Sequence, residues 1–118
     1  MTKGKLPSLP FVDIKNEVLG KDYDLSVVFV TEKESHKINL QTRAKDKPTN
    51  ILSFPLDKTS GEIIICPTYA KKEASQFDRI YSNYLAFLFI HGLVHLKGFD
   101  HGSRMETEEK KLRAKFSI

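Results

Sequence analysis

Three of the four histidines in this 118-residue sequence fall within one short window. His91 and His95 are four residues apart, so on a helix both imidazoles project from the same face. His101 would lie about 240° further round the axis of an uninterrupted helix, at ~100° per residue. Gly98 resolves this conflict, because glycine accepts the left-handed conformation that ends a helix and turns the chain back. The spacing therefore predicts that three imidazole nitrogens, from His91, His95 and His101, converge on one metal ion.

The expected metal is a single Zn²⁺ ion, because neutral imidazoles suit zinc best, although nickel or iron would also fit three nitrogens. No cysteine or carboxylate offers an obvious fourth ligand, so the fourth position is expected to hold water. A zinc ion lowers the pKa of bound water to about 7, which makes hydroxide available at neutral pH. Asp100, next to His101, has two equally weighted interpretations: a second-shell acceptor or base, or a solvated loop carboxylate.

The histidine spacing equals that of the metzincin proteases, H-E-x-x-H-x-x-G-x-x-H, with one difference. Gly92 stands where those enzymes carry the glutamate that acts as general base. A zinc deaminase is also disfavoured, because its Pro-Cys-x-x-Cys motif is absent and Cys66 is the only cysteine. The sequence thus predicts metal ligands spaced as in these proteases, but it lacks the glutamate that acts as their general base.

A second candidate segment carries Arg43, Lys45 and Lys47 just before a predicted strand. The planar guanidinium of arginine suits phosphate, and lysines add point charge. A short basic loop alone is usually solvated surface, but a cation opposite a hydrolytic metal would stabilise the extra negative charge of a phosphorane. We therefore expect Arg43 and His91 to be catalytic, and Arg43, Lys45 and Lys47 to bind phosphate.

The composition bounds the rest of the molecule. With 40% hydrophobic and 29% charged residues, the sequence predicts one globular domain over residues 1–118. Its net charge of +4 permits a polyanionic partner without demonstrating one. The single cysteine and the lack of a secretory pattern in residues 1–10 predict a cytoplasmic location. The most apolar stretch, residues 84–96, is shorter than the roughly 20 residues of a membrane span and is expected to be a buried core helix.

Periodicity and turn signals predict an α+β fold: a small mixed sheet of three to four strands with about five helices packed on it. The metal site is expected at the end of the central apolar helix. Capping boxes are predicted at residues 31–34 and 103–106, and a loop containing Ser60 and Gly61 is expected between the last two strands. The first strand is expected to be mostly buried. The predicted helices cover residues 11–19, 31–43, 67–77, 83–97 and the segment from 103, and the predicted strands cover 25–30, 50–54 and 62–66.

The histidine window, His91-Gly-x-x-His95-Leu-x-Gly98-Phe-Asp100-His101, resembles the signature of the YbeY endoribonucleases, the bacterial ribosomal RNA maturation factors. Residues 39–55 are similar to a second block of that family, and residues 61–67 resemble a third. The resemblance implies zinc on the three histidines and Arg43 as the basic residue of the active-site cleft. It also implies cleavage of single-stranded RNA, 3′-end processing of small-subunit ribosomal RNA, and a part in ribosome quality control. Ribosomal RNA and the ribosomal small subunit or its assembly proteins are then the expected partners.

Two departures from the family pattern and two alternative functions stand beside this expectation. The family usually begins with a strand, whereas residues 1–10 contain two prolines and predict a lost or shortened sheet edge. Glu62 stands where the family more often has Asp. One alternative function is a zinc peptidase or amidase that uses the same ligands. The other is a non-enzymatic ribosome assembly factor whose metal is structural, which a closed fourth coordination position would favour.

Overall fold

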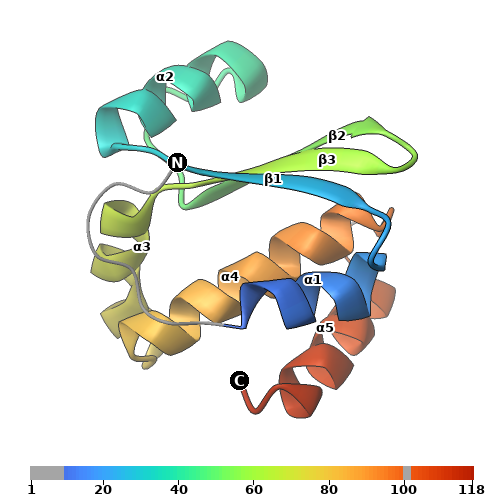
Figure 1. Ribbon diagram of the computed structural model, residues 1–118. Coiled ribbons are helices and arrows are strands. Elements are labelled where there is room, and N and C mark those ends of the chain that lie inside the picture. Colours follow the sequence, from blue (N-terminus) through green and yellow to red (C-terminus); the bar gives the residue numbers. More distant parts are fainter. Residues whose placement is uncertain (1–9, 100–101) are drawn as a thin grey trace.

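The computed structural model describes residues 10–99 and 102–118, which form a three-stranded mixed sheet with five α-helices (Figure 1). The strand order is β1-β3-β2, with β1 parallel and β2 antiparallel to the central β3. One helix, α2, lies on one side of the sheet and the others lie on the opposite side. The expected α+β class is confirmed. The elements in chain order are α1 (Phe11–Leu19), β1 (Asp24–Phe29), α2 (Glu32–Arg43), β2 (Ile51–Asp57), β3 (Ser60–Ile65), α3 (Pro67–Ala74), a 3₁₀ turn (Ser75–Phe77), α4 (Tyr81–Leu96) and α5 (Ser103–Lys115).

The hairpin between β2 and β3 is tighter than expected. Ser60 and Gly61, predicted in the connecting loop, belong to β3, and the turn is confined to residues 58–59. Asp57 closes this turn, because its Oδ1 accepts hydrogen bonds from the Thr59 N–H at 2.8 Å and the Thr59 hydroxyl at 3.2 Å. β2 continues through Pro55, which an edge strand tolerates because its outer N–H groups need no partner.

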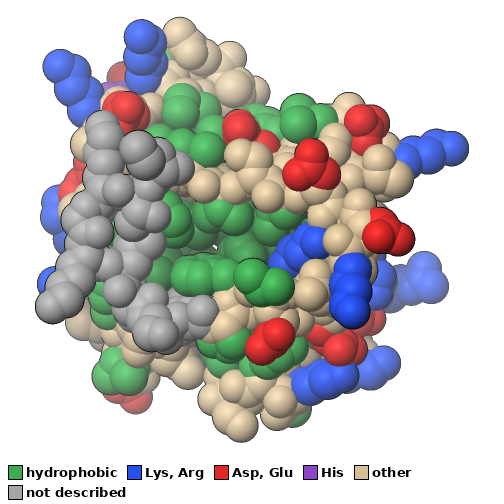
Figure 2. All heavy atoms as spheres, viewed as in Figure 1, with side chains coloured by type: hydrophobic (Ala, Val, Ile, Leu, Met, Phe, Trp, Pro, Cys, Tyr) green, Lys and Arg blue, Asp and Glu red, His purple; other side chains and the backbone are tan. Residues whose placement is uncertain are grey.

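The first strand, β1, is less buried than its β-branched sequence predicts. Its residues are exposed or half-buried, so the expectation of a mostly buried strand is wrong. The reason is that β1 is an edge strand and pairs only with β3 among the described strands. Apolar side chains gather in the hollow between β1 and α1, while lysines and arginines lie at the periphery (Figure 2). The predicted loss or shortening of an amino-terminal sheet edge concerns residues 1–10, of which 1–9 lie outside the described residues.

The apolar helix α4 forms the centre of the core, as expected. Leu85, Ile90 and Leu93 are completely buried, and they belong to the same cluster as Ile63 of β3 and Ile14 of α1. Gly92 allows the closest approach of this helix to the sheet. A Cβ atom at position 92 would lie 2.9 Å from both the Ile51 Cδ1 and the Ser53 Oγ atoms. The Ser53 hydroxyl also donates to the Gly92 carbonyl at 3.2 Å, so a strand side chain bonds the helix backbone here.

Two helix starts follow the sequence patterns and two depart from them. The capping box at Thr31 is confirmed, because the Glu34 N–H donates to the Thr31 hydroxyl at 3.1 Å and the Thr31 N–H donates to the Glu34 carboxylate at 2.9 Å. Pro67 opens α3, as predicted. The capping box predicted at Ser103 is wrong, since Gly102 is the N-cap residue and no side-chain cap is formed among the described residues at this helix start. α4 begins at Tyr81, two residues earlier than expected.

No helix in the described part of the chain combines the length and apolarity needed to cross a membrane. This agrees with the interpretation of residues 84–96 as a core helix.

Candidate active-site cleft

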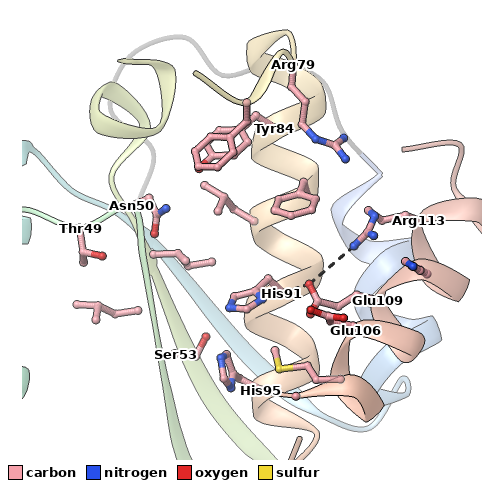
Figure 3. A pocket seen from close by; sticks show the side chains of 18 of the residues that line it. Thr49, Asn50, Ser53, Arg79, Tyr84, His91, His95, Glu106, Glu109 and Arg113 are labelled. Carbon is pink, nitrogen blue, oxygen red and sulfur yellow. Dashed lines mark hydrogen bonds and ion pairs between the residues drawn. The ribbon is translucent and has the colours of Figure 1, made fainter. Parts of the chain in front are cut away.

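A cleft of about 1030 Å³ lies between α4, α5, β2 and the end of α2. Arg43, His91 and His95 all line it, although Arg43 comes from a different helix far earlier in the chain. Figure 3 shows both histidines on one face of α4, directed toward the space between that helix and the sheet. The fold therefore brings together the two candidate groups that the sequence places in separate segments.

The histidine pair has the geometry expected from its four-residue spacing. The ring centroids of His91 and His95 lie 4.7 Å apart, and the ring planes are nearly perpendicular, at 86°. Both side chains are half-buried at the cleft wall, with 26% of the His91 side chain exposed. Two imidazoles from adjacent turns thus reach the same small volume at the edge of the core.

Hydrogen bonds define the orientation of both rings. The Nδ1 atom of His95 lies 3.1 Å from the carbonyl oxygen of Phe99. Because a carbonyl only accepts, Nδ1 of His95 carries a proton, and the lone pair of the neutral ring belongs to Nε2. The Nδ1 atom of His91 lies 3.1 Å from the Glu109 Oε1 atom, which gives the same tautomer when the carboxylate accepts. Metal-binding histidines in proteins are oriented by this type of contact to a carboxylate or a carbonyl.

The end of α4 turns back as predicted. Gly98 has φ of 111°, its N–H donates to the His95 carbonyl at 3.0 Å, and the Phe99 N–H donates to the Val94 carbonyl at 3.3 Å. This is the Schellman arrangement of hydrogen bonds at a helix end. It also places the Phe99 carbonyl where His95 donates to it, so the turn itself helps to orient a candidate ligand.

The third predicted ligand, His101, and the predicted second-shell residue Asp100 lie outside the described residues. Among the residues that are described, no three histidine, cysteine, aspartate or glutamate side chains are grouped so that they could hold a metal ion. His91 and His95 fit the predicted donor set, since both are imidazoles on one helix face and each has an acceptor beside its Nδ1 atom. The complete three-histidine site stays a prediction.

Glu109 is a site residue that the sequence analysis did not identify. Its side chain is 8% exposed, and Arg113 Nη1 approaches its Oε1 at 3.9 Å while His91 contacts the same oxygen (Figure 3). The Glu109/Arg113 spacing of four residues resembles a surface ion pair, which conceals the burial. A signal was nevertheless present, because Glu109 falls on the same face of α5 as the buried Met105 and Leu112. A carboxylate on an apolar face needs a buried partner.

Arg43 is the last residue of α2 and is exposed at the cleft. The chain turns sharply after it, since Ala44 adopts the left-handed conformation with φ of 55°. The following loop is attached to α2 by the buried side chain of Asn39, whose Nδ2 donates to the Lys47 carbonyl at 2.9 Å. The turn that presents Arg43 is thus held by a specific polar contact.

A second buried side chain, Ser35, attaches the end of the same loop. Its hydroxyl donates to the Thr49 carbonyl at 2.8 Å and accepts from the Thr49 N–H at 2.9 Å. On the exposed side, His36 Nε2 lies within hydrogen-bond distance of Asp46 Oδ1, at 2.6 Å. Lys45 and Lys47 are exposed on this loop, and neither is among the described residues that line the cleft. The structure therefore brings Arg43 to the histidines but leaves the two lysines outside the cleft.

The charge of the cleft favours an anionic substrate. Its lining includes four cationic side chains and two carboxylates, and one of those carboxylates, Glu109, already contacts His91 and Arg113. The fold and the cleft together define a small α+β domain in which two imidazoles and an arginine line one cationic cleft. Comparison with known proteins identifies the family to which such a domain belongs.

The chain belongs to the YbeY family: the family model described as Endoribonuclease YbeY matches residues 10–117. An endoribonuclease YbeY of Colwellia psychrerythraea is 41% identical over 97 residues, which cover 76% of this chain and 63% of that protein. One of Campylobacter jejuni is 38% identical over 103 residues, covering 80% of this chain and 76% of the relative. The chain thus spans about two thirds to three quarters of these relatives' length. The resemblance found in the sequence motifs is confirmed.

A solved structure supports the fold. The solution structure of TM1509 from Thermotoga maritima matches with a TM-score of 0.63 and 31% sequence identity, over 89% of this chain and 77% of that one.

Proposed function

We propose that this protein is a zinc-dependent endoribonuclease that cleaves single-stranded RNA, and that it acts in 3′-end maturation of small-subunit ribosomal RNA and in ribosome quality control. The observation that carries the proposal is the position of His91 and His95, oriented through their Nδ1 atoms, in the same cleft as Arg43. Membership of an endoribonuclease family supports the reaction class. The ribosomal substrate and the small-subunit partner rest on the family resemblance, and the cytoplasmic location rests on the single cysteine, which suits a reducing compartment.

His91, His95 and His101 would hold the zinc ion. When bound, zinc supplies Lewis acidity to a phosphoryl oxygen and lowers the pKa of water. The residues present fit this role, because the hydrogen bonds to Phe99 and Glu109 assign the lone pair of each neutral ring to Nε2. Glu109 in addition fixes the orientation of the His91 ring through the carboxylate contact, as carboxylates do behind metal-binding histidines.

Arg43 would bind the scissile phosphate. A guanidinium can donate two parallel hydrogen bonds to phosphate oxygens, and these strengthen as negative charge develops in the transition state. The residue is exposed enough to meet a substrate, yet the loop behind it is attached through Ser35 and Asn39. The exposed Lys45 and Lys47 would add attraction to neighbouring phosphates, so RNA binding should weaken as salt is added.

The preference for single strands is proposed from the position of the site inside a cleft. An unpaired strand can bend its backbone so that one phosphate reaches the histidines, whereas a stiff duplex resists this. The nucleophile can be water or the 2′-hydroxyl of the RNA itself, and either requires the same charge stabilisation by Arg43.

The structure disfavours the peptidase alternative at one position. The glutamate base of the metzincins corresponds to Gly92, which is buried against β2. Since a Cβ atom there would lie 2.9 Å from the Ile51 Cδ1 and Ser53 Oγ atoms, any side chain at position 92 would require these two side chains to move. The nuclease is therefore the better supported function. The remaining alternative, an assembly factor with a structural metal, is separated by the assay below.

The test uses zinc-loaded protein with a labelled single-stranded RNA, the same RNA as a duplex, and casein, each with and without chelator. We expect cleavage of the single strand only, loss of cleavage with chelator and in His91→Ala, and strongly reduced cleavage in Arg43→Ala with zinc content unchanged. Lys58→Ala, which removes an exposed charge at the β2–β3 turn, is the matched control and should behave as wild type.

Cleavage that persists in His91→Ala would indicate a contaminating nuclease and contradict the proposal. Intact RNA and casein with full zinc occupancy would favour the assembly factor. Casein cleavage would favour the peptidase.

A further inference from the structure

The cleft extends well beyond the histidines along α4. His95, His91, Leu88 and Tyr84 follow one another along a single face of this helix and all line the cleft. At 1.5 Å per residue, Tyr84 lies about 10 Å from His91 along the helix axis. Figure 3 shows Arg79 and Tyr84 at the opposite end of α4 from His95. The proposed chemistry uses only the histidine end, which leaves this second half unassigned.

Three aromatic rings form a stack in the second half of the cleft. The Phe77 and Tyr84 ring centroids are 5.4 Å apart with planes at 12°, and the Tyr84 and Phe87 centroids are 6.0 Å apart with planes at 13°. The outer ring, Phe77, is 58% exposed. Large apolar side chains are usually buried, so an exposed ring that continues a stack in a cleft presents a surface on which another planar group can lie.

Two guanidinium groups lie against the Phe87 ring, at one end of this stack. The central guanidinium carbon of Arg79 lies 4.6 Å from the centroid of the Phe87 ring, and that of Arg113 lies 5.1 Å from the same centroid. Arg113 is near the Glu109 carboxylate, at 3.9 Å. Arg79 instead donates a hydrogen bond to the neutral Asn83 amide, and no ion pair joins it to a carboxylate among the described residues. Its positive charge is thus available to an anionic ligand at the cleft wall.

The middle ring of the stack, Tyr84, is held in place by burial and by a hydrogen bond to Glu73. Tyr84 is buried, and its hydroxyl donates to the Glu73 carboxylate at 3.2 Å, while Asn50 Nδ2 donates to the same oxygen at 2.9 Å. Burial and the Glu73 charge raise the pKa of Tyr84 to about 12, so its ring stays a neutral phenol. The Tyr84 ring on which Phe77 stacks is therefore fixed in place without a ligand.

We propose that Phe77 and Arg79 form a second RNA subsite, in which a base of the single strand stacks on the Phe77 ring and a phosphate elsewhere on the same strand binds Arg79, at the Phe87 end of the stack. Aromatic faces beside cations are how proteins hold unpaired nucleic acid without reading its sequence. The inference rests on the proposed nuclease function. The separation of about 10 Å between Tyr84 and His91 along the helix axis corresponds to roughly three nucleotides at 3.4 Å each, and Phe77 lies one ring beyond Tyr84, so the bound base is at least about three nucleotides from the scissile phosphate.

Binding is measured first, with a fluorescent 2′-O-methyl octanucleotide that cannot be cleaved through its 2′ position and with a dinucleotide of the same chemistry. Phe77→Leu removes the ring and keeps the apolar bulk, and we expect it to weaken octanucleotide binding on the order of tenfold. Arg79→Gln removes one charge and should lower the salt dependence of binding, by about 0.7 in the log–log slope for a single strand. Dinucleotide binding should not change.

Conservative variants distinguish recognition from folding. Phe77→Tyr keeps the stacking face, so it should retain octanucleotide binding. Arg79→Lys keeps the charge, so it should retain the salt dependence of that binding. Lys58→Gln is the matched control for the loss of a charge outside the cleft. Cleavage of an all-ribose octanucleotide should fall in Phe77→Leu and Arg79→Gln through a higher KM, with kcat unchanged.

The outcomes separate this inference from the proposed function. Wild-type protein that binds the octanucleotide but cleaves no RNA would overturn the nuclease, and weakened binding in the two variants would still support the subsite. Wild-type levels of binding and unchanged KM in Phe77→Leu and Arg79→Gln would overturn the subsite and leave the nuclease intact. Equal losses for dinucleotide and octanucleotide would also overturn it, because they would mean that the variants disturb the histidine end.

Discussion

The two sides of the cleft are built in different ways. His91 and His95 stand on a helix whose opposite face is the centre of the core, and Glu109 supports them from a second helix packed against it. Arg43 ends α2, which lies on the other side of the sheet and makes no extensive contact with another described helix or strand (Figure 1). Its position depends on hydrogen bonds from Ser35 and Asn39 to the loop that follows.

This difference indicates a division of labour. Metal ligands must keep their separation within a few tenths of an ångström, and a closely packed core is the part of a protein that preserves such distances. A residue that meets a flexible anionic polymer gains more from access and from some freedom of movement. The predictions below test whether the two sides can be disturbed independently.

The largest effect is expected from removing one partner on each side. His95→Ala should abolish zinc binding and lower RNA cleavage at least a thousandfold, because two imidazoles cannot retain the ion or its chemistry. Arg43→Ala should also lower cleavage strongly but leave zinc content at wild-type level. Elemental analysis and cleavage rates on the same preparations give both readouts. Loss of zinc in Arg43→Ala would show that the two sides are not independent.

The next effect concerns the carboxylate behind His91. Glu109→Gln keeps the shape but removes the charge that stabilises the His91 ring, and we expect zinc affinity to fall 10- to 100-fold. The matched control is Glu108→Gln on the same helix, whose carboxylate lies 3.8 Å from Lys97. Competition with a zinc chelator of known affinity measures the difference. Equal zinc affinities for the two variants would remove Glu109 from the site.

The sequence predicts the histidine side of the cleft better than it predicts the Arg43 side. The histidine side is encoded locally, because His91, His95 and Gly98 are neighbours on one helix and their geometry follows from helix periodicity. The turn after α4 was predictable for the same reason. Glu109 was not identified from the sequence because its i,i+4 relation to Arg113 also fits an exposed ion pair. Only the buried neighbours on α5 distinguish a buried carboxylate from an exposed one.

Elsewhere, the sequence patterns were ambiguous. Residues 103–106 fit a capping box in which Ser103 would be the N-cap. In the structure the N-cap is Gly102, so Ser103 is already the first helical residue and cannot cap the helix. The run in β1 has the composition of a central strand, and composition does not reveal that the strand lies at the edge. Contacts between distant segments, such as Asn39 with the Lys47 carbonyl or Arg43 with the histidine cleft, depend on the tertiary fold and leave no local signal.

A third prediction concerns the contact of α4 with the sheet. In Gly92→Ala the new methyl group would lie 2.9 Å from the Ile51 Cδ1 and Ser53 Oγ atoms, so both side chains must shift and the hydrogen bond from Ser53 to the Gly92 carbonyl is disturbed. We expect a loss of about 1–3 kcal/mol in the free energy of unfolding. Because His91 adjoins this contact, zinc affinity should fall as well. Denaturant titration with and without zinc measures both, and an unchanged midpoint would contradict the close approach.

A fourth prediction concerns the loop side. Ser35→Ala leaves the buried N–H and carbonyl of Thr49 without their hydroxyl partner, which should cost about 1–3 kcal/mol. Arg43 then loses part of its support, so KM for RNA should rise while zinc affinity stays at the wild-type value. Ser26→Ala, at an exposed position of β1, is the control and should change neither. A fall in zinc affinity for Ser35→Ala would mean that the loop also positions the histidines.

The smallest expected effect has the opposite sign. Ala44 adopts the left-handed conformation at φ of 55° and ψ of 32°, where an L-residue with a side chain is strained by roughly 1 kcal/mol. Ala44→Gly relieves this strain at the cost of a more flexible unfolded chain, so we expect stabilisation of up to about 1 kcal/mol. Gln41→Gly, three residues earlier in α2, should instead destabilise by about 1 kcal/mol, because glycine disfavours a helix interior. Thermal denaturation of both variants gives the comparison, and destabilisation of similar size in both would show that the turn presenting Arg43 is not left-handed.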